Sequence, residues 1–444
     1  MHTVICWFRN DLRLADNAVF TRACGIATQM LPVYCHAPDA NVVTQWGFVR
    51  MDAPRQHWRR STVADLSRHL RALGSDLAEL HGRPQDVLAI AARAVGATTI
   101  VCELIAAPEE EAEVEGLRAA GFTVEPIWQS SMLAPAELPF APEQLPAVFT
   151  AFREAVERAR ILPAVPLPIP AKIPPLPELS LLTPEILKAP LLPPLRTDTR
   201  SSFPYHTTEF SGGAAAANAH LAQYFARKLA HSYKATRNGL SGADYSSKFS
   251  PWLATGALSA RTAYAALKRF EAEYGANEGS YWLWFELLWR DYFRLLHLKH
   301  GRKLYAASGL SSLPKRAHDA GRFLKWCNAM TGEPLVDAAM RELAATGYLS
   351  NRLRQIVAGY LLHELCGDWR AGAAWFEAQL IDYDVYSNQG NWLYIAGRGS
   401  DPRGGRRFNL HKQASLYDAD GRYRALWNQP VVLSCLPEGR HIES

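Results

Sequence analysis

The chain lacks paired cysteines and long apolar runs. Its seven cysteines are scattered and none forms a CxxC pair, so the sequence carries no zinc or iron–sulfur signature. Their irregular spacing fits reduced thiols in a cytosolic protein. Arg, Glu or Pro interrupts the most apolar stretches well short of the roughly 20 residues of a membrane span. With no signal-peptide pattern at the start, we expect a cytoplasmic protein without a metal site or a membrane partner.

A strong excess of one charge is also missing. The net charge of +5 permits an anionic partner such as nucleic acid but does not require one. At roughly 150 residues per domain, 444 residues predict two or three domains. Nearly half of the residues are hydrophobic, which excludes global disorder.

Short β-rich runs alternate with helical patterns over residues 1–130. Strands are expected at 3–7, 30–35, 98–104 and 122–127. A helix is expected over 54–73, with an apolar stripe of Val63, Leu66, Leu70 and Leu73. Another is expected from Pro84 to Gly96, with a stripe of Val87, Ile90, Ala91, Ala94 and Val95. This alternation predicts an α/β domain with a parallel, Rossmann-like sheet.

Prolines recur every few residues between 163 and 194, which excludes a long helix or a central strand there. We therefore expect an interdomain linker over 131–205. Helical patterns dominate afterwards, for example over 262–270, 281–297, 335–345, 352–365 and 371–380. The range 206–444 is thus expected to be an all-α domain.

Several segments contain residues suited to ligand binding. Residues 6–17 read CWFRNDLRLADN, and residues 243–256 read ADYSSKFSPWLATG. Small hydroxyl residues and free N–H groups before a helix can bind a pyrophosphate, although such a stretch alone is more often a helix cap. Residues 285–294 read FELLWRDYFR, where Glu286 and Arg290 have the spacing of an i,i+4 ion pair.

Three further segments complete the set. They read NRLRQ at 351–355, LIDYDVYSNQGNWLY at 380–394 and DPRGGRRFN at 401–409. Together with YKATRN at 233–238, these segments resemble the DNA photolyase/cryptochrome family, and most closely its DASH branch. For residues 6–17 the resemblance implies a structural role in the loop and the domain contact, not a catalytic one. The resemblance covers nearly the whole chain outside the proline-rich stretch.

The resemblance implies FAD as cofactor. The residues implied to bind it are Tyr233, Ser246, Ser247, Lys248, Phe249, Ser250, Glu286, Arg290, Asn351, Arg354, Asp382, Asp384 and Asn388. Asp382 is expected to pair with Arg354, and Asp384 to hold the ribityl chain or the ring edge. Asn388 would lie opposite flavin N5, where its amide oxygen can accept a hydrogen bond.

The resemblance also implies light-driven repair of cyclobutane pyrimidine dimers, with single-stranded DNA preferred because extruding the lesion then costs less unpairing energy. Residues implied to contact the lesion or to act in catalysis are Glu286, Trp289, Asn351, Gln355, Tyr394 and Asn388. The expected phosphate contacts are Arg237, Arg352, Arg403 and Arg406. Relatives that repair the (6-4) photoproduct have histidine at the positions of Asn351 and Gln355, so that reaction is not expected.

Electron supply and light harvesting depart from the family pattern. Trp392 and Trp369 match the first two tryptophans of the family's electron relay, but the outer position is Arg316. The relay is then either cut short or rerouted through Trp326, Trp375 or Tyr383. A methenyltetrahydrofolate antenna would need a glutamate where Ala106 aligns, unless Glu103 or Glu109 replaces it.

Three functions remain open at the level of sequence. The first is the repair enzyme, working as a monomer. The second is a non-enzymatic blue-light receptor, and the third is a vestigial flavoprotein that binds a small aromatic molecule. Intact Glu286, Trp289, Asn351 and Asn388 favour the enzyme.

Overall fold

A five-stranded parallel sheet forms the first part of the molecule. The computed structural model describes residues 2–36, 38–189, 191–195, 198–314, 317–401 and 405–428. The strand order is β3-β2-β1-β4-β5. The strands are β1 (Thr3–Phe8), β2 (Gln29–His36), β3 (Ala78–His81), β4 (Thr99–Glu103) and β5 (Thr123–Ile127), and the helices between them are α1 (Ala18–Ile26), α2 (Ala53–Ala72), α3 (Pro84–Ala94) and α4 (Pro108–Ala119).

Alternation along the strands explains the two layers of helices. Ile5 packs with Val87 of α3 and Val114 of α4, while its neighbour Val4 packs with Phe20 of α1 and Val63 of α2. Successive strand residues point to opposite faces, so β1 is buried on both sides. The expected α/β fold class is confirmed.

Some local expectations for this domain were wrong. Strand β3 was not foreseen, because Ala78–His81 is short and contains Glu79. Ile90 was assigned to the buried stripe of α3 but is 41% exposed, whereas Leu88 and Ala92 are fully buried. The buried face is therefore rotated by about one residue from the expected stripe. Leu73, expected on the buried face of α2, follows the end of that helix and is exposed.

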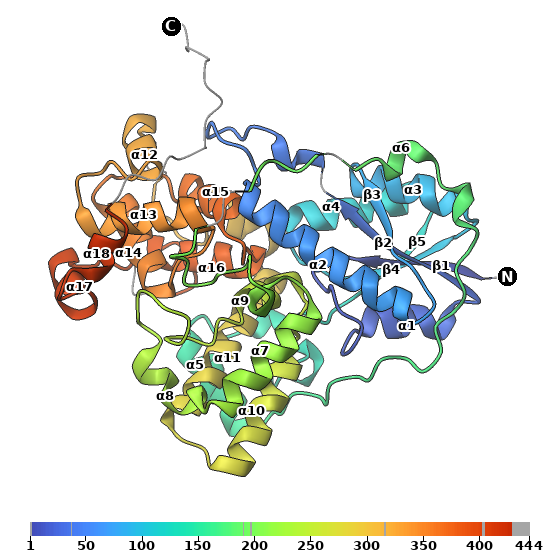
Figure 1. The fold of residues 1–444 in the computed structure, drawn as a ribbon, viewed down its shortest axis with the longest axis horizontal. Helices are drawn as coiled ribbons and strands as arrows, with labels where there is room; N and C mark the ends of the chain where they lie inside the picture. The colour runs from blue at the N-terminus through green and yellow to red at the C-terminus, as the bar shows by residue number, and fades with distance from the viewer. Residues whose placement is uncertain are drawn as a thin grey trace, which may run out of the picture.

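After β5 the described chain has helices but no strand, as expected from residue 206 onward (Figure 1). Its helices are α5 (Phe149–Ala159), α6 (Pro184–Leu187), α7 (Ala214–Ala226), α8 (Leu229–Thr236), α9 (Ser250–Thr255), α10 (Ala260–Tyr274), α11 (Glu278–His300), α12 (Ala320–Cys327), α13 (Pro334–Thr346), α14 (Asn351–His363), α15 (Trp369–Gln379), α16 (Val385–Ala396), α17 (Leu410–Tyr417) and α18 (Arg422–Leu426). In Figure 1 most of these helices fill the left and the bottom of the view, whereas α6 lies with the sheet on the right. No helix in the described part of the chain is long and apolar enough to span a membrane.

The proline-rich stretch follows the surface of the α/β unit (Figure 1). Asp16 N–H donates to Leu167 O at 2.7 Å, and Met30 N–H donates to Pro175 O at 3.1 Å, so backbone hydrogen bonds hold the stretch on the sheet domain. Within the expected linker range, α5 is an amphipathic helix whose Phe152 and Val156 join the core that contains α11. That helix packs with the helical half.

The loop after β1 joins the two halves. Leu12 N–H donates to Thr255 O at 3.1 Å, and Arg13 Nη1 donates to Gly256 O at 2.9 Å. Gly256 has φ +73°, and a Cβ on it would lie 2.0 Å from Asn10 O, so only glycine fits this close approach. Residues 6–17 therefore act in the domain contact, which agrees with the structural role expected for them.

Candidate functional site

One pocket of the helical half contains most residues expected to contact the flavin ring. It lies between α14, α15 and α16, and its lining includes Asn351, Arg354, Gln355, Phe376, Asp382, Asp384, Asn388 and Trp392. Asn351 starts α14 directly after its cap Ser350, and Asp384 caps α16, so two helix starts position these polar side chains. The fold brings together segments that are 30 residues apart in the sequence.

Arg354 and Asp382 form the expected ion pair at this pocket. Arg354 Nη2 lies 2.8 Å from Asp382 Oδ2, and Arg354 Nε donates to Leu349 O. Burial lowers the pKa of Arg354, but Asp382 outweighs that effect and raises it, so the guanidinium stays charged. The other carboxylate oxygen of Asp382 is buried and has no hydrogen-bond partner in the described protein. It is free to accept from a ligand.

Asp384 is already engaged by protein groups. Arg294 Nη2 lies 2.5 Å from Asp384 Oδ2, and Asp384 Oδ1 caps α16 by accepting from Ser387 N–H at 2.7 Å. Burial raises its pKa, but Arg294 and Arg290 outweigh burial and lower the pKa to about 2. Asp384 is therefore ionised across the working pH range. Its expected contact with the flavin stays a prediction.

The amide of Asn388 has a defined orientation. Its Nδ2 donates to Ala373 O of α15 at 3.0 Å. Because the nitrogen is used in this bond, the amide oxygen is the group left to face a ligand. This is the orientation that a hydrogen bond from a flavin N–H would need.

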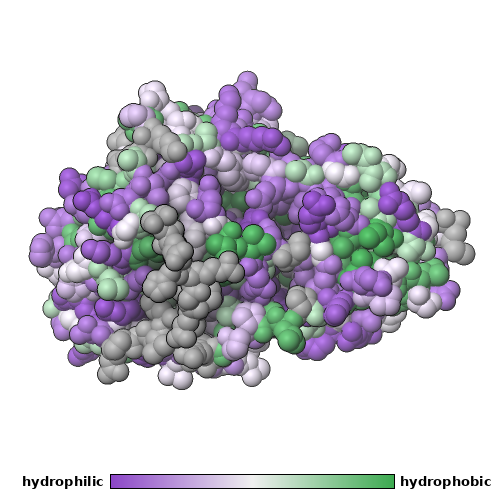
Figure 2. Space-filling model, turned by 90° about the horizontal axis from the view of Figure 1, so that it is seen from above, coloured by the Kyte–Doolittle hydropathy of each residue, from purple (hydrophilic) through white to green (hydrophobic). Residues whose placement is uncertain are grey.

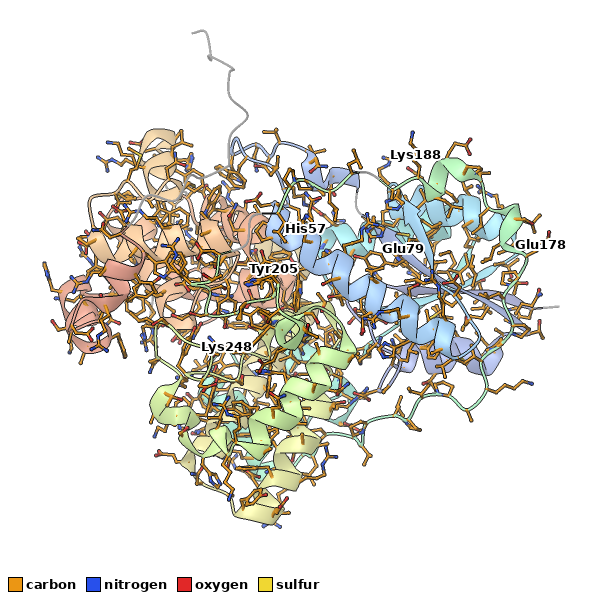
Figure 3. All side chains as sticks on the ribbon, in the orientation of Figure 1. His57, Glu79, Glu178, Lys188, Tyr205 and Lys248 are labelled. Atoms are coloured by element: carbon orange, nitrogen blue, oxygen red, sulfur yellow. The ribbon has the colours of Figure 1, made fainter. Side chains whose placement is uncertain are left out.

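Lys248 carries a buried amine that has no carboxylate in direct contact. The residue is 2% exposed, precedes α9, and its Nζ has no hydrogen-bond partner among the described residues. Nζ lies 3.4 Å from the ring centroid of Tyr245 and 4.9 Å from that of Tyr348. Burial lowers the pKa of this amine well below its usual value. Figure 3 labels it inside the helical half. A buried amine without a protein partner can bind an anion such as a diphosphate, which would stabilise its charged form.

The nearby diphosphate segment fits the same interpretation. Ser246, Ser247 and Lys248 lie in the loop between α8 and α9, and Phe249 and Ser250 begin α9. His220 of α7 hydrogen-bonds to Ser247 O at 2.9 Å and fixes part of this loop. Tyr233 is buried on α8 beside it. With the orphaned oxygen of Asp382, these groups fit FAD.

Glu286 has a different partner from the one its spacing suggested. It pairs with Arg237, and the i,i+4 pair with Arg290 does not form. Arg290 instead donates to the backbone oxygens of Ser130, which follows β5, and Leu253 on α9. Burial lowers the pKa of Arg290 to about 10. Burial also raises the pKa of Glu286, and Arg237 opposes this only in part.

Trp289 and Tyr394 form an aromatic corner. Their ring centroids are 6.0 Å apart with an interplanar angle of 63°. The hydroxyl of Tyr394 accepts from Arg406 Nε at 3.0 Å. The corner joins α11 to α16, so residues from the two motifs expected to contact a lesion do meet in space.

The basic residues expected to contact DNA also have protein partners. Arg352 donates to Asn238 Oδ1 at 2.9 Å and to Gln355 Oε1 at 3.3 Å. Arg406 bonds Tyr394, and Arg237 bonds Glu286. Arg403 lies outside the described residues. Their role toward DNA stays a prediction.

Both expected relay tryptophans are buried. Trp392 is 2% exposed and meets Phe376 and Trp326 at centroid distances of 5.1 and 6.5 Å. Trp369 donates from Nε1 to Ala307 O at 3.0 Å. Position 316 lies outside the described residues. Among those described, no group of three or more His, Cys, Asp and Glu could hold a metal ion.

Sequence reasoning missed some residues of the site. Arg294, which binds Asp384, stood at the end of a recognised segment and could have been found from its charge in a buried helix. Tyr245 and Tyr348 contact Lys248, but no local pattern announces such a tertiary contact. Phe149 stacks on Trp289 and was missed because its segment was assigned to the linker.

Comparison with known proteins agrees with this geometry. Residues 4–174 match the family model described as DNA photolyase, and residues 282–432 match the model described as the FAD binding domain of DNA photolyase. The cryptochrome DASH of Gloeobacter violaceus is 44% identical over 436 residues, covering 96% of this chain and 85% of that protein. The cryptochrome DASH of Xenopus laevis is 42% identical, with 96% and 82% covered.

Solved structures give the same relationship. A cryptochrome of Synechocystis sp. PCC6803 superposes with a TM-score of 0.88 at 40% identity, covering 96% of this chain and 88% of that one. A class III photolyase of Agrobacterium tumefaciens gives a TM-score of 0.74 at 29% identity, covering 96% and 86%. The chain therefore belongs to the DNA photolyase/cryptochrome family and is most like its cryptochrome DASH members.

Proposed function

We propose that this protein uses FAD and blue light to split cyclobutane pyrimidine dimers in DNA. The observation that carries the proposal is the aromatic corner of Trp289 and Tyr394, with Glu286 one helical turn before Trp289 on α11. A flipped pyrimidine pair needs stacking surfaces and a polar group at its base edges, and this site offers both. When bound, FAD supplies the single electron that opens the dimer and takes it back.

The protein's contribution is binding and orientation. Lys248 would pair with the diphosphate. Asp382, held by Arg354, would accept a hydrogen bond from the flavin through its unpartnered carboxylate oxygen. The amide oxygen of Asn388 would accept a hydrogen bond from an N–H of the flavin ring, since the amide nitrogen of Asn388 already donates to Ala373 O. Asn351 and Gln355 are amides that cannot donate a proton near neutral pH, so the (6-4) photoproduct is not the proposed substrate.

Single-stranded DNA is the proposed preferred form. Extruding a lesion from a single strand avoids the cost of breaking base pairs. Arg352 and Arg406 would exchange their present partners for phosphates, which predicts salt-dependent binding. The monomeric, cytoplasmic state expected from the sequence also stays a proposal.

A light-harvesting group is a second proposal for the same protein. A cavity of about 980 Å³ lies where β1, β2 and α4 face α15, and Arg9, Arg55 and Arg59 are among its lining residues. An aromatic antenna would fit this space. Ala106 is buried, Glu109 pairs with Arg50, and burial raises the pKa of Glu103 to about 7. Folate binding through Glu109 would thus require that carboxylate to leave Arg50, and Glu103 stays the alternative carboxylate.

The receptor function is the alternative, since the similar proteins carry the name cryptochrome. The deciding experiment is repair of a thymine-dimer oligonucleotide under blue light with a reductant, beside a dark control. Light-dependent repair supports the enzyme. Absence of repair by protein that binds reducible FAD would favour the receptor. Absorbance of the extracted chromophores tests the antenna in the same preparation.

A further inference from the structure

We propose that Phe149 is a positioning residue that fixes the plane of Trp289 and leaves one face of the indole for a base; this inference rests on the proposed function. The two rings are stacked, with centroids 3.8 Å apart and planes 10° apart. Trp289 also meets Tyr292, Phe293 and Tyr394, but those rings are tilted or edge-on. Among the described residues, Phe149 alone stacks on this indole.

Phe149 is itself held firmly. It is 5% exposed and meets Phe285 and Tyr292 edge-on at 5.0 and 5.7 Å. The preceding segment is tied to α11, because Lys299 Nζ donates to Leu145 O and the Tyr292 hydroxyl lies 2.7 Å from Ala147 O. A ring packed on its edges and anchored through its backbone cannot easily leave its place.

The consequence concerns how Trp289 binds. An indole free to rotate would lose side-chain entropy when a base stacks on it, whereas a fixed indole has already lost it. Because Phe149 covers one face of the Trp289 indole, one base can stack on the opposite face. The Tyr394 ring meets the indole edge-on, so it borders the space beside Trp289 without stacking on the face left for a base.

The test is a double-mutant cycle on binding of a thymine-dimer single-stranded oligonucleotide in the dark. Phe149→Leu keeps an apolar side chain but removes the ring. Aromatic stacking beyond simple burial corresponds to a loss of affinity of about two- to tenfold. In a Trp289→Ala background, Phe149→Leu should cause no further loss, and Phe149→Tyr, which keeps the ring, should bind like the parent protein.

Phe152→Leu is the matched control. Phe152 lies on the same helix, is fully buried, and contacts both Tyr292 and Phe149, but makes no ring contact with Trp289. It should lower thermal stability as Phe149→Leu does and leave affinity within twofold of the parent. Equal affinity losses in the two Leu variants, or equal losses from Phe149→Leu with and without Trp289, would overturn the positioning role.

The near-UV circular dichroism of the four proteins of the cycle, the parent, Phe149→Leu, Trp289→Ala and the double variant, separates the two proposals. A spectral change in Phe149→Leu that disappears in the Trp289→Ala background reports the coupling of the two rings without any DNA. If that coupling is present but the parent protein binds no dimer oligonucleotide, the proposed function fails, and the positioning role fails with it. If the parent binds and Phe149→Leu binds equally well, only the positioning role is wrong.

Discussion

Arg237, which follows α8, donates to Glu286 on α11 and also lies over the ring of Trp282, with its guanidinium carbon 4.5 Å from the ring centroid. The carboxylate assigned to the lesion is therefore partnered in the free protein. The same arginine was expected to contact a phosphate. A lesion bound here would have to share this pair or separate it, so substrate binding and the Arg237–Glu286 contact are coupled.

Glu286→Ala is expected to weaken repair while FAD stays bound. A charged hydrogen bond contributes roughly 1.5–3 kcal/mol, so the efficiency of dimer repair should fall about ten- to a hundredfold. Glu278→Ala is the control, because Glu278 pairs with Lys234 at the exposed start of the same helix. Repair rates under blue light measure the effect, and an unaffected rate in Glu286→Ala would remove Glu286 from the mechanism.

Asn388→Ala is expected to shift the flavin away from its reduced states. The amide oxygen, oriented by Ala373 O, is the proposed acceptor for a hydrogen on the ring, and alanine cannot replace it. Spectroscopic redox titration and photoreduction follow the change. Asn218→Ala is the control, since exposed Asn218 bonds Ala214 O within α7, away from this pocket. If Asn388→Ala leaves both measurements as in the parent, the proposed contact does not exist.

Lys248→Met is expected to keep or raise the stability of the FAD-free protein and to weaken its binding of FAD. Its charged form is disfavoured by burial in the free protein, so the variant should unfold at an equal or higher urea concentration. Loss of the cation should weaken FAD binding roughly tenfold or more. Urea denaturation of the FAD-free protein and equilibrium dialysis with FAD measure the two effects. Unchanged FAD affinity would mean that the diphosphate lies elsewhere.

Arg352→Ala is expected to reduce the salt dependence of binding to single-stranded DNA. Each phosphate contact adds about 0.7 to the slope of log affinity against log salt. The variant should lose about that much, whereas Arg118→Ala on α4, where Arg118 pairs with Glu115, should keep the parental slope. Fluorescence anisotropy at several salt concentrations gives the slopes. Parallel lines for Arg352→Ala and the parent would exclude this contact.

Glu342 gives the protein a pH-dependent stability. Burial raises its pKa to about 7, above the 4.5 of an exposed glutamate, although Tyr423 and Ser202 donate to it. Its contribution is complete below pH 4.5 and is lost as the pH rises through 7. Glu342→Gln should flatten this decline by up to ~3 kcal/mol. Urea denaturation at pH 5 and 7 tests this, with Glu333→Gln as control. An equally steep decline in Glu342→Gln would assign the effect to other carboxyls.

The sequence predicted best those features that depend on local periodicity or on a single recognised segment. The strand–helix alternation, the paired Arg354 and Asp382, and the loop of residues 6–17 were all foreseen, because each depends on periodicity or on a recognised segment. The Glu286–Arg237 pair and the Phe149–Trp289 stack were not, since each joins distant segments. Local spacing favoured Arg290 for Glu286, but Arg290 instead donates to the backbone oxygens of Ser130, after β5, and Leu253, on α9.

The face of the molecule drawn in Figure 2 adds little to the prediction of partners. The face seen from above in Figure 2 is mostly hydrophilic, with small separate hydrophobic patches. Scattered patches of this kind are normal for a folded protein and do not identify a binding surface. The functional claim therefore depends on the site between α11, α14 and α16.

The most direct test of the repair claim compares single-stranded and double-stranded thymine-dimer oligonucleotides under blue light with a reductant, each with a dark control. We predict light-dependent repair in both arms or in the single strand alone, with the single strand repaired faster. Repair in neither strand form, by protein that holds reducible FAD, would contradict the account of this site as a dimer-repair centre.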